Sequence, residues 1–329
     1  MIFKTFFTMQ KVNLYLFVFL FVVLSCQQKK LAFIHNPIYD KYLADPTIVK
    51  LNDTFYVYAT IDPWGSNELA VLATKDFISW KPEKINWPTK EACTSATSLN
   101  EMVWAPSVVK ANGAYYMYVT VGGEVWVGTS KHPLGPWKNA KADGSPLIRN
   151  GKFPGYHMID AEPFLDDDGQ AYLFWGSGLD WKPGHCFAVK LQKDMISFDG
   201  EIKEVTPPNY MEAPFMLKRN GLYYLMYSEG FCIDHTYKVR YSTGPTPFGP
   251  WKEGANSPIL STTSDSTTYG PGHHTVFNEN GQNYILYHRL KFPLEKNTVL
   301  RQLCIDSLNF DESGNIKKID PKGVTRFIK

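Results

Sequence analysis

The sequence has no block of basic residues and almost no net charge. Its 329 residues include 34 Lys and Arg against 32 Asp and Glu, which gives a formal net charge of +2 at pH 7. Proteins that bind nucleic acids concentrate positive charge on one segment or face, and no segment here does so. We therefore expect no nucleic-acid partner.

Cysteine is scarce, with five residues in the whole chain. No C-x-x-C pair and no Cys/His spacing typical of a zinc site is present. Cys26 lies near the N-terminus, and the other four are Cys93, Cys186, Cys232 and Cys304. If the chain is exported, these four lie in an oxidising compartment, where they allow three disulfide pairings between which the sequence does not choose.

Long apolar runs are also missing, with one short exception at residues 14–24 (LYLFVFLFVVL), which follow a segment with two lysines. This run is short for a membrane span, and its pattern is typical of a secretory signal. Cys26 after VVLS resembles the lipidated cysteine of a bacterial lipoprotein; a plain signal peptide with an incidental cysteine is the alternative. We predict a signal at 1–26, a tether at 27–37, and a lipid anchor at Cys26 as the only membrane contact, in the periplasm or at the cell surface.

A repeated pattern fills the rest of the chain, where helical periodicity is weak. Five segments run from a small or polar residue through an apolar stretch and an Asn-Asp, Asn-Gly or Asp-Gly turn into an aromatic-rich strand; they start at Asp45, Ala105, Glu162, Ala213 and His273. Such turns favour tight hairpins, and a second strand–turn–strand segment follows each repeat. Five units of four strands predict an all-β fold, a five-bladed β-propeller with four antiparallel strands per blade, as one domain at residues 38–329.

The first strand of each propeller blade lies nearest the axis, so the starts of these strands converge on one pocket. In blade order they carry Asp45, Trp104, Asp160 with Glu162, Glu212, and His273 with His274. An acid before a proline at one strand entry is commonly turn chemistry. Acids are depleted in strands, however, and here three blades direct them to one axis.

Several carboxyl groups around one axis suit the hydrolysis of glycosidic bonds. One carboxylic acid protonates the leaving oxygen, while a second carboxylate activates water or attacks the sugar directly. Their pKa values must be driven apart, and a third carboxylate beside the acid raises the pKa of that acid by like-charge repulsion.

Five segments resemble, in order and spacing, the motifs of glycoside hydrolase family 43: LADPTIV, VWAPSVV, MIDAEPFLDDDGQAYLFWG, YMEAPFML and YGPGHHTVF. The resemblance runs from about Ile38 to the C-terminus and implies a five-bladed propeller enzyme that cleaves arabinosides and xylosides with inversion. It implies that Asp45 is the general base, that Glu212 is the general acid, and that Asp160 orients the acid and tunes its pKa.

The resemblance also implies roles for residues around the three acids. Trp104 corresponds to an aromatic residue of the pocket; a core Trp between blades is the alternative. Arg289 corresponds to an arginine that contacts substrate in some members, although an Arg at a strand end is usually solvated. His273 corresponds to a histidine that faces an axial calcium ion or its waters in many members; from the residues alone it is a core histidine. Glu162 occupies the register of Asp45 in the repeat and either lines the pocket, contacting substrate, or bonds a neighbouring strand.

We therefore expect an exo-acting inverting glycosidase that releases α-L-arabinofuranosyl or β-D-xylosyl residues from plant polysaccharides or oligosaccharides. We expect it to be a monomer that needs no cofactor for its chemistry, with a structural Ca²⁺ as an option on the axis. Alternatives are a galactan- or arabinan-active member of the same family, a catalytically silent glycan-binding propeller, and a retaining fructan-active propeller, which the absence of an Arg-Asp-Pro sequence disfavours. Inversion predicts a carboxyl separation of roughly 6.5–9.5 Å between Asp45 and Glu212.

Overall fold

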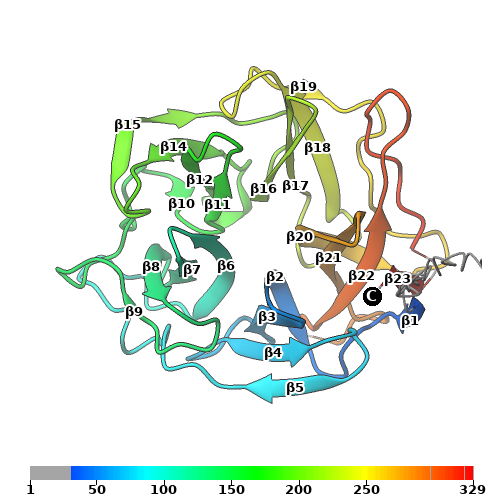
Figure 1. Cartoon of the computed structure of the whole chain (residues 1–329), viewed down its shortest axis with the longest axis horizontal. Helices are drawn as coiled ribbons and strands as arrows, with labels where there is room; N and C mark the ends of the chain where they lie inside the picture. Colours follow the sequence, from blue (N-terminus) through cyan, green and yellow to red (C-terminus); the bar gives the residue numbers. More distant parts are fainter. Residues whose placement is uncertain (1–30, 297, 322, 329) are drawn as a thin grey trace, which may run out of the picture.

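The structure, a computed structural model, describes residues 31–296, 298–321 and 323–328. Five antiparallel sheets surround a central axis, and the first strand of each lies innermost (Figure 1). The predicted five-bladed β-propeller is confirmed. The predicted signal peptide and Cys26 lie outside the described residues. Within the described part, no helix has the length and apolar character needed to span a bilayer.

The first three blades each contain four strands, ordered from the axis outwards. Blade 1 contains β2 (Leu43–Leu51), β3 (Thr54–Ile61), β4 (Ala70–Thr74) and β5 (Trp80–Glu83). Blade 2 contains β6 (Val103–Ala111), β7 (Ala114–Val121), β8 (Glu124–Ser130) and β9 (Lys138–Asn139). Blade 3 contains β11 (Glu162–Leu165), β12 (Ala171–Trp175), β14 (Phe187–Leu191) and β15 (Phe198–Glu204). A small sheet of β10 (Tyr156–His157) and β13 (Ser177–Gly178), followed by the 3-10 turn η1 (Leu179–Trp181), adjoins blade 3.

The last two blades complete the ring. Blade 4 contains β16 (Glu212–Arg219), β17 (Leu222–Glu229), β18 (Lys238–Gly244) and β19 (Lys252–Glu253). Blade 5 contains β20 (Tyr269–Glu279), β21 (Gln282–Leu290) and β22 (Arg301–Leu308). Its expected fourth strand is reduced to one bridge between Phe310 and Ile316.

The rim of blade 5 carries an additional two-stranded sheet. In it β1 (Leu31–His35) pairs with β23 (Val324–Ile328) along its whole length (Figure 1). The predicted tether at 27–37 includes β1, where Ile34 is 1% exposed and packs into the core with Phe327. Burial of these apolar side chains explains why the segment forms a strand.

The apolar core lies between the blades and leaves the axis free for polar groups. Each of five buried clusters joins two neighbouring blades; the cluster between blades 1 and 2, for example, contains Tyr58, Val71, Met117 and Trp126. Aromatic and β-branched side chains suit such pleated, packed surfaces, which explains the aromatic-rich second strands of the repeat.

The inner strands share an irregular backbone where they begin. One residue per blade has a left-handed conformation, with φ between 40° and 58°: Asp45, Ala105, Asp160, Ala213 and His273. Register shifts accompany it in blades 1, 2, 4 and 5. Non-glycine residues rarely adopt this conformation, and bulges of this kind redirect side chains.

In four blades, a side chain from the second strand of the preceding blade supports this conformation. The backbone N–H of the left-handed residue donates to that side chain in four cases: Asp45 to His288 Nδ1, Ala105 to Thr60 Oγ1, Asp160 to Thr120 Oγ1, and His273 to Ser228 Oγ. Asp45 and Asp160 are therefore structurally equivalent, whereas Glu212 lies one residue earlier, in the position of Trp104.

Candidate active site

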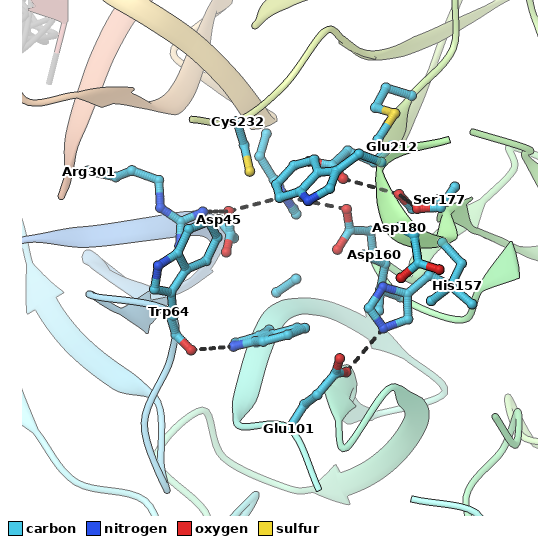
Figure 2. Close-up of a pocket in the computed structure, with 18 residues that line it drawn as sticks. Asp45, Trp64, Glu101, His157, Asp160, Ser177, Asp180, Glu212, Cys232 and Arg301 are labelled. Carbon is cyan, nitrogen blue, oxygen red and sulfur yellow. Dashed lines mark hydrogen bonds and ion pairs between the residues drawn. The ribbon is translucent and has the colours of Figure 1, made fainter. Parts of the chain in front are cut away.

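A cavity of about 280 Å³ opens where the inner strands begin (Figure 2). Five of the residues proposed from the sequence line it: Asp45, Trp104, Asp160, Glu212 and His273. The three acids come from blades 1, 3 and 4, as the repeat predicted.

Positive or polar groups surround the carboxylate of Asp45, which is 6% exposed. Arg301 Nη1 donates to its Oδ1 at 3.1 Å, and the Nδ1 atoms of His273 and His288 each lie 3.2 Å from the same oxygen. Burial alone would raise the pKa of Asp45, but Arg301 and the two histidines outweigh burial and hold this pKa well below its usual range. Asp45 is therefore ionised, as a general base must be.

Arg301 is itself fixed from behind. Its Nη2 lies 2.7 Å from Oδ1 of Asp62, whose side chain is completely buried, and its backbone N–H donates to Asp62 Oδ2 at 2.6 Å. The ring of Trp64 covers the guanidinium group at 5.9 Å. The positive charge beside Asp45 is thus held in one place by a carboxylate and an aromatic ring.

Glu212 and Asp160 lie on the other side of the cavity (Figure 2). Tyr237 Oη donates to Glu212 Oε1 at 2.7 Å, and Ser177 Oγ donates to Glu212 Oε2 at 3.2 Å. Burial raises the pKa of Glu212, and the charge of Asp45 adds to this effect, while Tyr237 and Ser177 oppose it. Burial and the charges of Glu212 and Asp45 raise the pKa of Asp160 well above its usual value. The pKa values of this pair are therefore shifted upwards, opposite in direction to that of Asp45 across the cavity.

The remaining wall is aromatic and polar. Trp104 Nε1 donates to the carbonyl oxygen of Trp64 at 2.8 Å. The intervening Gly65 allows this contact, because a Cβ there would lie 2.3 Å from Trp104 Nε1. Next to Trp104, His157 Nε2 lies 3.1 Å from Glu101 Oε2, and both line the cavity. Together they offer a flat apolar face and hydrogen-bonding groups to a sugar.

Glu162 does not line the cavity with the other acids. It lies two residues beyond Asp160, where its Oε2 accepts a hydrogen bond from Ser107 Oγ of blade 2 at 2.5 Å, and burial raises its pKa to about 8. The proline alignment of the repeat equates Glu162 with Asp45, but the left-handed backbone equates Asp160 with Asp45. The position of Glu162 gives no support for substrate contact and agrees with the alternative, a bond to a neighbouring strand.

Arg289 also lies outside the cavity. Its guanidinium group donates to the carbonyl oxygen of Thr267. Successive side chains of a strand point to opposite faces, so that His288 reaches Asp45 while Arg289 points away. The substrate contact expected of Arg289 has no support from this position, and Arg301 provides the arginine of the cavity instead.

His273 bridges two acids rather than presenting a free ligand. Its Nδ1 lies 3.2 Å from Asp45 Oδ1 and 3.7 Å from Asp160 Oδ2, and burial lowers its pKa to about 4. Calcium prefers oxygen ligands, and the described residues contain no group of three or more His, Cys, Asp or Glu side chains placed to hold a metal. This donor set does not fit a directly bound ion. The axial calcium stays a prediction, which elemental analysis of the purified protein would check.

Several groups of the site escaped the sequence analysis: Arg301, His288, Tyr237 and Ser177. His288 and Arg301 come from the second and third strands of blade 5, Ser177 from β13, and Tyr237 from the loop before β18, whereas the repeat points to first strands. His288 and Arg289 are neighbours on one strand and point to opposite faces. This alternation could have identified His288 if the sequence had shown which of the two faces the cavity.

The four cysteines of the described chain are all buried and unpaired, so the structure contains none of the three disulfide pairings that the sequence allowed. Cys232 lines the cavity.

Comparison with known proteins gives one family. The family described as glycosyl hydrolases family 43 matches residues 34–316. A β-D-galactofuranosidase of Aspergillus niger is 34% identical over an alignment of 302 positions, which covers 87% of this chain and 84% of that protein. A xylosidase/arabinosidase of Bacteroides ovatus is 26% identical over an alignment of 333 positions, which covers 85% of this chain and 96% of that protein. An arabinoxylan arabinofuranohydrolase of Bacillus subtilis is 27% identical, and the match covers 77% of this chain but 57% of that protein.

Solved structures agree. A thermostable family-43 glycoside hydrolase superposes with a TM-score of 0.72 at 26% identity, covering 90% of this chain and 98% of that one. An α-L-arabinofuranosidase from Clostridium thermocellum superposes with a TM-score of 0.67 at 27% identity, covering 87% of this chain and 96% of that one.

Proposed function

The chain belongs to glycosyl hydrolases family 43 and is a glycosidase, and from this premise we propose that it is an exo-acting, inverting enzyme that releases α-L-arabinofuranosyl residues from plant polysaccharides or oligosaccharides. One observation carries the proposal: a single small cavity holds Asp45, whose pKa is lowered, opposite Asp160 and Glu212, whose pKa values are raised. A small cavity rather than a long groove favours a terminal sugar.

The proposed reaction is one displacement. Asp45 accepts a proton from water while the water oxygen bonds to the anomeric carbon. The bond from that carbon to the leaving oxygen breaks, and Glu212 donates its proton to this oxygen. Asp160 opposes the ionisation of Glu212 and so keeps it protonated before the reaction. The separation of roughly 6.5–9.5 Å expected for the carboxyl groups of Asp45 and Glu212 stays a prediction.

A second substrate, a terminal β-D-galactofuranosyl residue, is favoured by the 34% identical relative, which is named for that activity. An α-L-arabinofuranosyl and a β-D-galactofuranosyl ring have the same arrangement of ring hydroxyl groups and differ by one exocyclic hydroxymethyl group. One catalytic constellation can therefore serve both sugars, and the choice depends on space beside the ring. The β-D-xylosyl residue is the third candidate, supported by the xylosidase/arabinosidase relative.

A panel of chromogenic α-L-arabinofuranosides, β-D-galactofuranosides and β-D-xylosides, with arabinan, xylan and arabinogalactan fragments, tests the proposal. We expect the arabinofuranoside to be cleaved fastest, and NMR of the first product to show the inverted anomer. Glu212→Ala should lose activity chiefly on substrates with a poor leaving group, because they need the proton most. Binding of oligosaccharides without turnover of any glycoside would instead establish a glycan-binding propeller.

For localisation we propose export and lipid attachment at Cys26, on the evidence of the N-terminal sequence pattern alone. Metabolic labelling with a radioactive fatty acid should label the wild-type protein and leave Cys26→Ala unlabelled. Label in both proteins, or in neither, would contradict the anchor.

A further inference from the structure

Tyr237 lies directly behind the proposed general acid. It is 0% exposed and does not line the cavity, so it does not touch a bound sugar. Its Oη donates to Oε1 of Glu212 at 2.7 Å, the shorter of the two side-chain hydrogen bonds to that carboxyl group. Glu212 itself is partly exposed to the cavity. Tyr237 thus holds Glu212 without contacting the substrate.

The same tyrosine ring also contacts the support of the proposed base. It stacks on His288 with centroids 5.7 Å apart and an interplanar angle of 8°. His288 is completely buried, accepts the backbone N–H of Asp45 at Nδ1, and keeps that atom 3.2 Å from Asp45 Oδ1. A continuous chain of contacts therefore runs from Glu212 through Tyr237 and His288 to Asp45.

Gly272 makes room for this stack. It pairs with His288 across β20 and β21, and a Cβ on Gly272 would lie 2.0 Å from the Tyr237 ring. Any larger residue would therefore displace the ring and its hydroxyl group. This requirement explains the second glycine of the GPGHH segment, which the catalytic roles leave unexplained.

We propose that Tyr237 is a positioning residue that, through its stack on His288, holds the acid Glu212 and the base Asp45 as one unit. The names acid and base rest on the proposed hydrolase function. The contacts of Tyr237 with Glu212 and His288 do not depend on it. When Glu212 gives its proton to the leaving oxygen, it becomes a carboxylate, and the Tyr237 hydroxyl donates a hydrogen bond to that carboxylate. Tyr237 thereby favours proton release from a carboxyl group whose pKa burial raises.

Other charged and titratable groups face the pair and stay in place in the test: Asp45, Asp160, Tyr210, Cys232, His288 and Arg301. Tyr237→Phe keeps the ring and its stack and removes only the hydroxyl group. We expect kcat to fall about 10- to 100-fold, as for the loss of a hydrogen bond to a charged group. The alkaline limb of the pH–rate profile should move to higher pH by about one unit, because the ionised form of Glu212 loses its donor.

A matched control is Tyr58→Phe, because Tyr58 is also completely buried but donates to the backbone carbonyl of Pro133, away from the cavity. It should lose stability without a shift of the alkaline limb. Gly272→Ala, which crowds the ring, should shift the limb in the same direction as Tyr237→Phe; should it fail to fold, Tyr237→Phe alone still decides.

A measurement without turnover separates this inference from the hydrolase proposal. Titration of the Glu212 carboxyl carbon by ¹³C NMR, assigned with Glu212→Gln, should show a raised pKa in Tyr237→Phe whether or not any glycoside is cleaved. An upward shift in both readouts supports the proposal. If the NMR pKa of Glu212 in Tyr237→Phe equals that of the wild type, the inference is overturned, even in an active enzyme. If this pKa rises but the protein hydrolyses no glycoside, only the hydrolase function is overturned.

Discussion

The two sides of the cavity hold carboxyl groups in opposite environments. On the side of blades 5 and 1, Asp45 lies among a fixed guanidinium group and two imidazoles. On the side of blades 3 and 4, Asp160 and Glu212 have each other and neutral hydroxyl donors. All three acids lie close to the start of an inner strand, so the backbone position alone does not determine their pKa values.

The difference arises from what the neighbouring strands contribute. Arg301 begins β22 and brings a cation to Asp45, whereas Tyr237 and Ser177 bring only hydrogen bonds to Glu212. Repetition of one structural unit thus supplies equivalent positions, and the strands behind them make one acid a base and another a proton donor.

The largest effect is expected when the ionised carboxylate of Asp45 is removed, because the two sides of the cavity then no longer differ in charge. Asp45→Asn should reduce kcat about 10³- to 10⁴-fold, because no other group in this position accepts the proton of water. The loss should be similar for good and poor leaving groups, unlike that of Glu212→Ala. Asp40→Asn, an exposed aspartate before the same strand, should behave as wild type in the same assays. Retained activity in Asp45→Asn would exclude Asp45 as the base.

The second change weakens the proton-retaining side. Asp160→Asn replaces one carboxyl group of the coupled pair by a neutral amide, so that Glu212 no longer ionises beside a second carboxylate; the alkaline limb of the pH–rate profile should move to lower pH, with a loss of about 10²-fold in kcat. This shift is opposite in direction to that expected for Tyr237→Phe. An alkaline limb that stays in place would show that the charge of Asp160 does not tune the acid.

The third change makes the two sides more alike. Arg301→Gln removes the largest influence that lowers the pKa of Asp45, so this pKa should rise and the acidic limb should move to higher pH by about 1 to 3 units. Arg301→Lys keeps the charge and should leave the limb near its wild-type position. Equal shifts in both variants would indicate that geometry rather than charge sets the basicity of Asp45.

The smallest effect concerns the mouth of the cavity and leaves the environments of Asp45, Asp160 and Glu212 unchanged. Trp181 lines the cavity, is 48% exposed and packs edge to face with Phe231 at 5.8 Å. We expect Trp181→Ala to raise KM for oligosaccharides about 10-fold through lost stacking and to leave KM for methyl glycosides unchanged. Leu222→Ala, at the distant hairpin of blade 4, is the control with similar exposure. Equal increases for both substrates would place Trp181 at the terminal sugar instead.

The sequence was sufficient for the blades and the three acids, because both leave local signals. Hairpin turns recur with the repeat, and each acid precedes a proline by one to three residues at a strand entry. Arg301, His288 and Tyr237 leave no such signal, since each reaches the site from far along the chain. Glu162 shows the remaining difficulty: prolines align it with Asp45, but only the backbone conformation reveals that Asp160 is the true equivalent.

The pairing of β1 with β23 has a practical consequence for handling the protein. Both strands lie on the outer rim of blade 5, while the cavity lies at the axis (Figure 1). An affinity tag, a surface linker or a fusion partner joined ahead of Leu31 is therefore attached at the rim of the propeller and not at its axis. Immobilised preparations made through this end should keep their substrate entrance unobstructed.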